Sequence, residues 1–204
     1  MEQHNSVIVP TIEKGSLVLV TGVTGYIASH TANHVLEAGY RVRGTSRSKE
    51  KAQWLFDLFD EKYGKGKFEV SVVEDMMAEG AFDEAVKGVD GILHMASVLT
   101  FEEDPDKVIP PTVKGALNIL TSATKEASIK SLVLTSSSAS ALIPHPNEVI
   151  NVTEDTWDTE ALDLVDKGEA DGFAVYAASK TEAERAFWKA IDETKPPFQA
   201  AAVS

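Results

Sequence analysis

The sequence predicts an α/β fold of the Rossmann type, a doubly wound parallel sheet with helices on both faces. Short apolar stretches alternate with longer amphipathic stretches along the chain, and this alternation is typical of a parallel sheet covered by helices. A glycine-containing turn, Thr21–Ala28, follows the first apolar stretch, where dinucleotide-binding folds hold a pyrophosphate. The strand order expected for such a fold is 3-2-1-4-5-6.

The alternation places each element by residue number. Short apolar stretches predict buried strands over 16–21, 40–45, 67–73, 89–96, 129–135 and 198–203. Helical spacing of apolar residues predicts helices over 25–38, 48–63, 79–87, 113–126 and 171–192. Inward faces are expected for Ile27, Ala28, Ala32, Val35 and Leu36, and for Trp54, Leu55, Leu58 and Phe59. The stretch 144–170, rich in proline and acidic residues, is predicted to be irregular and long enough to be functional.

Composition narrows the class of protein. The net charge of −13 would repel nucleic acid. The absence of cysteine excludes disulfides, thiolate catalysis and cysteine-based zinc sites, and His4, His30, His34 and His145 show no ligand spacing, so no metal is predicted. No stretch is long enough to span a membrane, and the first fifteen residues lack the apolar core of a secretory signal. A cytoplasmic protein without nucleic-acid or membrane partners is expected.

The turn after the first strand carries the features of a pyrophosphate site. Gly22 permits a tight turn, Gly25 allows close approach of the backbone to a phosphate, and the small Ala28 lets the helix pack on the strand. Free N–H groups at the helix start would then face the anion. A glycine pair alone often marks only a turn, but here it lies inside a strand–helix–strand unit.

A cluster of basic residues favours NADP(H) over NAD(H). The second strand ends without the carboxylate that NAD enzymes use for the ribose 2′-hydroxyl. It ends instead at Arg47, whose guanidinium could pair with a 2′-phosphate, and Lys51 follows one helical turn later. Arg41 and Arg43 lie close by. Cations at a helix start oppose the helix dipole, so their position suggests a bound anion rather than a solvated basic turn.

Tyr176 and Lys180 form the candidate catalytic pair. They lie four residues apart in a predicted helix and therefore project from one face. A free phenol titrates at about 10, and a neighbouring ammonium stabilises the phenolate, which makes such a pair a tunable general acid. The spacing itself is common, and a helix with Ala177 and Ala178 toward the core would supply it by chance.

Two strand ends support the functional interpretation. The strand 129–135 ends in hydroxyls, Thr135–Ser138, where a serine could donate to a substrate carbonyl or merely cap loop backbone groups. Small residues near Ala96 would let a cofactor lie against the sheet. His94 is expected to be a packed or hydrogen-bonded core residue rather than a catalyst.

In order along the chain, Thr21-Gly22-x-x-Gly25-x-x-Ala28, Thr135-Ser136-Ser137 and Tyr176-x-x-x-Lys180 resemble the motifs of extended short-chain dehydrogenases/reductases. Residues 45–47, 111–115 and 154–158 are similar to the dihydroflavonol-reductase-like branch, which includes fungal and yeast aldehyde and ketone reductases. Thr112 stands where many epimerase-type relatives have Asn, which argues against that branch. The resemblance implies NADPH-dependent reduction of an aldehyde or ketone, with β-keto esters among the candidates.

The resemblance also assigns roles to residues. Tyr176 would protonate the carbonyl oxygen, Lys180 would hold the nicotinamide ribose, and Ser137 would be the catalytic serine, unless Ser136 or Ser138 takes that role. Asp75 and Met76 would border the adenine, and Ala96 and Val98 the nicotinamide ribose. Contacts with NADP(H) are expected from Gly22, Thr24, Gly25, Tyr26, Ile27, Arg47, Lys51, Asp75, Met76, Ala96, Val98, Ser136, Tyr176 and Lys180.

Two alternatives stay open: a non-catalytic NADP-binding or NADP-sensing protein on the same fold, and a steroid- or flavonoid-type dehydrogenase. Relatives continue past the sixth strand into a segment that completes the substrate pocket, whereas this sequence ends at Ser204. We therefore expect one NADP-binding domain over 1–204 that carries the catalytic residues but lacks that segment. A monomer or homodimer is expected, with the helices 113–126 and 171–192 as candidates for a dimer face.

Overall fold

The computed structural model of the protein describes residues 11–204. Most of the N-terminal stretch used to argue against a secretory signal lies outside these residues, as does His4. Within residues 11–204, no helix is long and apolar enough to cross a membrane.

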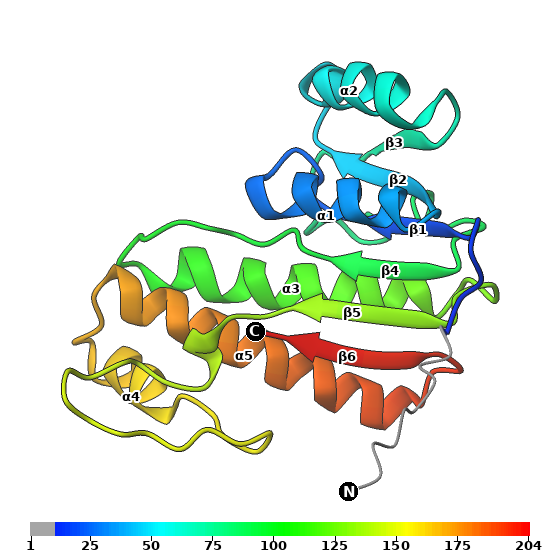
Figure 1. Cartoon of the computed structure of the whole chain (residues 1–204). Helices are drawn as coiled ribbons and strands as arrows, with labels where there is room; N and C mark the ends of the chain where they lie inside the picture. The colour runs from blue at the N-terminus through cyan, green and yellow to red at the C-terminus, as the bar shows by residue number, and fades with distance from the viewer. Residues whose placement is uncertain (1–10) are drawn as a thin grey trace, which may run out of the picture.

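In the part of the chain that the structure describes, six parallel strands form one sheet in the order β3-β2-β1-β4-β5-β6, as predicted. The strands are β1 (Leu17–Val20), β2 (Arg41–Ser46), β3 (Phe68–Val72), β4 (Gly91–His94), β5 (Ser131–Thr135) and β6 (Gln199–Val203). Their carboxyl ends all point to the left in Figure 1. The strand order reverses between β1 and β4, and open α/β sheets bind ligands at this reversal.

Five α-helices and two 3-10 turns accompany the sheet within the described residues. They are α1 (Tyr26–Glu37), η1 (Glu50–Ala52), α2 (Gln53–Tyr63), α3 (Pro105–Ala123), η2 (Ser138–Ser140), α4 (Thr159–Lys167) and α5 (Gly172–Thr194). Alternate residues of β1 enter two cores: Val18 and Val20 pack with α1 and α2, whereas Leu17 and Leu19 pack with α3 and α5. The sheet therefore has helices on both faces, which confirms the Rossmann-type prediction.

The helix predicted over 113–126 begins eight residues earlier than expected and ends at Ala123. Pro110 and Pro111 lie inside this helix, although proline lacks the N–H that an α-helix uses. The helix nevertheless begins at Pro105, where the side chain of Asp104 caps the first turn by accepting a hydrogen bond from Asp106 N at 3.2 Å. Packing of α3 against α5 (Figure 1) compensates for the lost hydrogen bonds.

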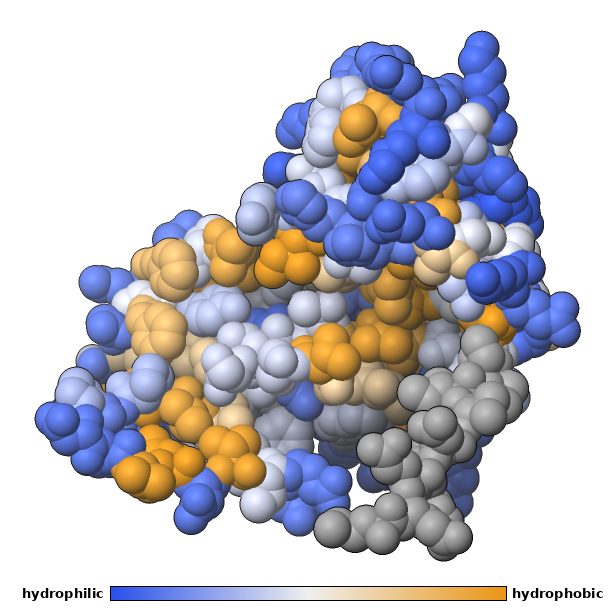
Figure 2. All heavy atoms as spheres, viewed as in Figure 1, coloured by the Kyte–Doolittle hydropathy of each residue, from blue (hydrophilic) through white to orange (hydrophobic). Residues whose placement is uncertain are grey.

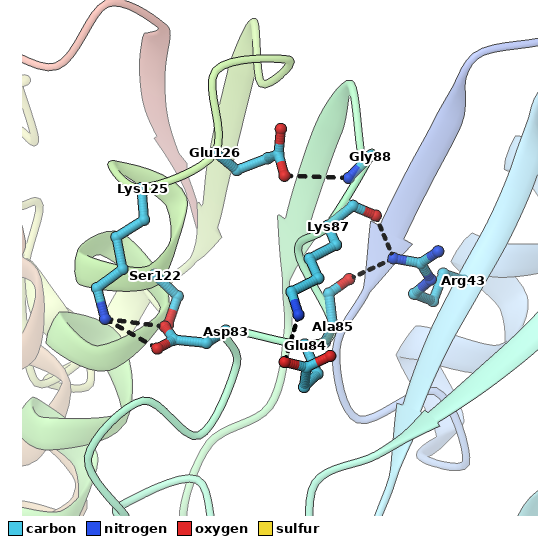
Figure 3. A network of polar contacts seen from close by, with 9 residues as sticks. All are labelled: Arg43, Asp83, Glu84, Ala85, Lys87, Gly88, Ser122, Lys125 and Glu126. Atoms are coloured by element: carbon cyan, nitrogen blue, oxygen red, sulfur yellow. Dashed lines mark hydrogen bonds and ion pairs between the residues drawn. The ribbon is translucent and has the colours of Figure 1, made fainter.

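The prediction of a helix over 79–87 is wrong, because this segment forms a series of turns. Side chains from distant elements hold it (Figure 3). Arg43 on β2 donates to the carbonyls of Ala85 and Lys87 at 2.9 and 2.6 Å, and Asp83 pairs with Lys125 at 2.9 Å. These long-range contacts outweigh the weak helical tendency of a short segment.

Two further sequence expectations need correction. The stretch 144–170 is not wholly irregular, because it contains α4. Asp158 caps that helix by accepting from Ala161 N at 3.0 Å, and burial raises the pKa of Asp158. Of the residues expected to face inward, Ile27, Trp54 and Leu58 are 63%, 49% and 45% exposed.

Candidate active site

A cleft of about 880 Å³ runs across the carboxyl ends of the strands. It brings together residues from the turn after β1, the end of β2, the segment after β3, the end of β4 and the start of α5. Thirteen predicted site residues line it: Gly22, Thr24, Gly25, Tyr26, Ile27, Arg47, Asp75, Met76, Ala96, Val98, Ser136, Tyr176 and Lys180. Ser137 and Lys51 are not part of the lining.

The turn between β1 and α1 presents backbone to the cleft. Gly22 has φ +67°, and a side chain there would place Cβ 3.2 Å from the Ala96 backbone, so only glycine fits. Gly25 is the N-cap of α1 and forms no side-chain cap hydrogen bond, and the first turn of the helix holds no acidic residue. This geometry leaves the helix start open to an anion.

The end of β2 offers a guanidinium beside a buried hydroxyl. Arg47 is exposed, lines the cleft and forms no ion pair with any carboxylate in residues 11–204. The neighbouring Ser46 Oγ is buried and has no hydrogen-bond partner among the described residues. Buried hydroxyls are normally satisfied, so this unpaired group suits a polar ligand. Arg43 is directed elsewhere, since it pairs with Glu69 at 2.7 Å.

The segment after β3 is fixed by α3. Asn118 Nδ2 donates to the carbonyls of Met76 and Ala78 at 2.8 and 3.0 Å. Asp75 Oδ1 accepts from Met77 N at 2.8 Å, which closes a tight turn. Asp75 and Met76 therefore hold a set position at the far end of the cleft from Tyr176.

At the other end of the cleft, Lys180 is 6% exposed. Its Nζ donates to the carbonyl of Thr135, the last residue of β5, at 3.1 Å. Burial lowers the pKa of Lys180, and the carboxylate of Glu184 opposes that change. Tyr176 lies one turn earlier on the same face of α5, while Ala177 and Ala178 are buried.

His94 joins β4 to the turn after β1, and its role as a buried, hydrogen-bonded residue is confirmed. Thr21 Oγ1 accepts from the N–H groups of Met95 and Ala96, both at 2.9 Å, and lies 3.0 Å from His94 Nδ1. Because both lone pairs of Thr21 Oγ1 are occupied, its proton must go to His94 Nδ1. A ring nitrogen that accepts a hydrogen bond carries no proton, so the imidazole of His94 is neutral in this arrangement. Burial, with a contribution from Lys180, lowers the pKa of His94 to about 3.

Apolar side chains surround Tyr176 on the open side of the cleft. The rings of Phe101 and Phe173 lie 5.8 and 6.3 Å from the Tyr176 ring. The Phe101 segment is held against α5, because a Cβ on Gly172 would lie 2.1 Å from the Phe101 carbonyl oxygen. Figure 2 shows apolar surface on both sides of this hollowed face, over the connection after β4 and over the loop that precedes α4.

The serines after β5 have different environments. Ser136 lines the cleft and donates to Glu184 Oε2. Ser137 caps η2, where its Oγ accepts from Ala139 N at 3.2 Å. Both serines therefore also serve the backbone or a carboxylate, as the alternative of loop capping anticipated.

Sequence reasoning missed several cleft residues. Ser46 lines the cleft beside Arg47 but carries no motif. Phe101 and Phe173 lie outside the lining, and only the three-dimensional structure places their rings beside Tyr176. Glu184 could have been found, because it continues the four-residue spacing of Tyr176 and Lys180 along one helix face.

The sequence is similar to that of known proteins along nearly its whole length. Residues 18–200 match the family model described as the NAD dependent epimerase/dehydratase family. The chain is 49% identical over 197 residues to aldehyde reductase 2 of Sporidiobolus salmonicolor, covering 94% of this chain and 57% of that protein. It is 41% identical over 202 residues to ketoreductase adrE of Penicillium rubens, covering 98% of this chain and 58% of that protein.

The fold matches solved structures as well. The yeast methylglyoxal/isovaleraldehyde reductase Gre2, complexed with NADPH, superposes with a TM-score of 0.82 at 31% identity, over 92% of this chain and 57% of that one. Vestitone reductase from alfalfa gives a TM-score of 0.75 at 27% identity, over 92% and 56%. The chain thus spans somewhat more than half the length of these relatives. Because the family model covers nearly the whole sheet, the chain belongs to the NAD dependent epimerase/dehydratase family of extended short-chain dehydrogenases/reductases.

Proposed function

We propose that this chain binds NADPH in its cleft and takes part in the reduction of an aldehyde or ketone to the alcohol. One observation carries the proposal: Tyr176 and Lys180 line the same cleft as the glycine turn and Arg47. The names of the relatives, an aldehyde reductase and a ketoreductase, agree with this chemistry.

The residues present fit NADPH. The open start of α1 and the close approach of Gly22 to Ala96 suit a pyrophosphate. Arg47, without an acidic partner in residues 11–204, and the unpaired hydroxyl of Ser46 suit a 2′-phosphate. Asp75 and Met76 would border the adenine, and Ala96 and Val98 the nicotinamide ribose. Lys51, exposed and four residues after Arg47 in the sequence, would add a point charge.

The bound nicotinamide would supply the hydride that attacks the carbonyl carbon. Tyr176 would donate its phenolic proton to the carbonyl oxygen as charge develops there. The ammonium form of Lys180, buried next to the carbonyl of Thr135, would stabilise the phenolate that remains. Ser137 would donate a hydrogen bond to the same substrate oxygen.

The substrate is proposed to carry an apolar group beside its carbonyl. Phe101 and Phe173 flank the Tyr176 ring, and Leu99 next to them is 70% exposed. Burial of such surface by a ligand is favourable. β-Keto esters, which join a reactive ketone to an apolar ester, therefore belong in the test panel.

Replacement of Tyr176 by Phe tests the proposal. We expect the Tyr176→Phe variant to retain NADPH binding, measured by nicotinamide fluorescence, and to lose about 10²–10⁴-fold in NADPH oxidation with the best aldehyde, ketone or β-keto ester. Tyr40→Phe is the matched control, because among the described residues the Tyr40 hydroxyl donates one hydrogen bond, to the carbonyl of Ile12 at 3.4 Å, and Tyr40 does not line the cleft. Full activity of Tyr176→Phe would exclude the mechanism. Tight NADPH binding by the wild-type chain without turnover across the panel would favour a non-catalytic NADP-binding protein.

A further inference from the structure

Glu184 lies on α5 one turn after Lys180, behind the wall of the cleft. Its Oε2 accepts hydrogen bonds from the hydroxyls of Ser136 and Ser140, the second at 2.8 Å. Its Oε1 accepts from Trp188 Nε1 at 3.4 Å. The proposed reduction uses no carboxylate, so it does not explain these hydrogen bonds of Glu184.

The carboxylate distinguishes among the serines after β5. A carboxylate only accepts hydrogen bonds, and each hydroxyl has a single proton to donate. Ser136 donates to Glu184, and the proton of Ser140 is held between Glu184 and the Ser137 carbonyl, each 2.8 Å away. Ser137 Oγ only accepts, from Ala139 N, and its own proton has no acceptor within residues 11–204. The Ser137 hydroxyl is therefore uncommitted as a donor within residues 11–204, whereas Ser136, which lines the cleft, is committed to Glu184.

The same carboxylate acts on Lys180. Groups face the Lys180 ammonium from three elements: the Thr135 carbonyl on β5, the neutral imidazole of His94 on β4, and Tyr176 and Glu184 on α5 itself. Burial lowers the pKa of Lys180, and among these groups Glu184 is the one that raises it. A carboxylate one turn away stabilises the ammonium by direct charge attraction.

Burial makes this attraction effective. Lys180 and Glu184 both line a small cavity of about 10 Å³ together with Ser97 and Thr112, which is roughly the room that one water molecule needs. Lys180 is 6% exposed and Glu184 is half-buried, so solvent screens the two charges less than it would at the surface.

We propose that Glu184 is a positioning residue for the cleft. Its carboxylate engages Ser136 and Ser140, leaves the Ser137 hydroxyl uncommitted as a donor, and stabilises the ammonium of Lys180 by charge attraction. What Ser137 and Lys180 then do for a substrate rests on the proposed function, but the effect of Glu184 on their state does not.

The test compares Glu184→Gln with Glu182→Gln in the same chain. Both variants remove one negative charge from α5, but Glu182 is partly exposed and, within residues 11–204, forms an ion pair with Arg185 alone, at 3.6 Å. The rate of Lys180 acetylation by acetic anhydride at neutral pH, measured by mass spectrometry against Lys189, reports the uncharged fraction of Lys180. We expect this rate to rise by at least about threefold in Glu184→Gln and to stay unchanged in Glu182→Gln.

Rescue and folding controls complete the experiment. Glu184→Asp keeps the charge and should return the Lys180 acetylation rate toward the wild-type value, and thermal unfolding should show that every variant is folded. An equal rate in Glu184→Gln and Glu182→Gln would overturn the proposal. Where the chain turns over, kcat should fall in Glu184→Gln while KM for NADPH changes little. A chain that neither binds nor oxidises NADPH would contradict the proposed function, and the acetylation comparison would still decide the role of Glu184.

Discussion

The two sides of the cleft are built by different means. On the side of β1, β2 and β3, the chain offers backbone at the glycine turn and exposed side chains such as Tyr26 and Arg47. On the side of β4, β5 and α5, it offers buried polar groups, His94 and Lys180, which are held by hydrogen bonds from other elements. The first side suits recognition of an anionic ligand, and the second suits control of a proton.

This difference predicts how each side fails. Where the backbone packs closely, an added side chain causes a steric clash, so glycine substitutions should impair the first side. Buried polar groups depend on their protonation state, so the second side should respond to pH. The following predictions test that contrast.

The largest effect is expected for Gly44→Ala, on the first side. A Cβ at Gly44 would lie 2.4 Å from Val23 Cγ1 and 2.8 Å from Val23 Cβ, and Val23 is fully buried inside the glycine turn. Overpacking of this kind costs about 2–3 kcal/mol, which lowers Tm by roughly 5–10 °C for a chain of this size. Thermal unfolding measures the loss, and NADPH fluorescence should show weakened binding.

Gly115→Ala is the control for this prediction. The three atoms nearest to its Cβ would belong to the flexible side chain of Met76, the first at 3.2 Å, so the stability of Gly115→Ala should stay much closer to that of the wild type. Equal stability of Gly44→Ala and the wild-type chain would contradict the idea that the first side depends on close backbone packing.

A pH-dependent effect is expected for His94, on the second side. The pKa of His94 is lowered from about 6.5 to about 3 in the folded protein. The unfolded chain therefore binds a proton that the folded chain cannot, so stability is complete above about pH 6.5 and declines as the pH falls toward 3. At pH 5.5 the loss should approach about 1.4 kcal/mol.

The variant His94→Gln isolates this contribution. Urea unfolding at pH 7.5 and pH 5.5 gives the change in stability for each protein, and the wild type should lose about 1 kcal/mol more than His94→Gln between the two values. Identical losses in the two proteins would mean that His94 is not held neutral.

Features set by local sequence were predictable. The glycine turn, the strand order and the Tyr176/Lys180 pair all follow from short-range spacing, and the structure places the turn and the pair in one cleft. The apolar periodicity also located most helices, because one face of each helix enters the core.

Features set by distant contacts were not predictable. The segment 79–87 adopts turns because Arg43 and Lys125, from elements far along the chain, bind its carbonyls and Asp83. The early start of α3 needed packing against α5 to outweigh two prolines. Ser136 donates a hydrogen bond to Glu184, which lies 48 positions further along the chain. No local motif reveals a contact over that separation.

The smallest effect is expected for Lys51, on the first side. Arg47 lines the cleft with a planar fork that can bind a phosphate through two hydrogen bonds, whereas Lys51 lies outside the lining as an exposed point charge. We expect Lys51→Ala to weaken NADPH binding about threefold and Arg47→Ala about tenfold or more, with NADH binding almost unchanged in both. Fluorescence titration with the two nucleotides makes the comparison. If Lys51→Ala equals Arg47→Ala, the 2′-phosphate lies nearer to η1 than the cleft lining implies. If both variants lose NADH and NADPH affinity equally, neither side chain selects the 2′-phosphate, and selection on this side depends on the backbone and Ser46.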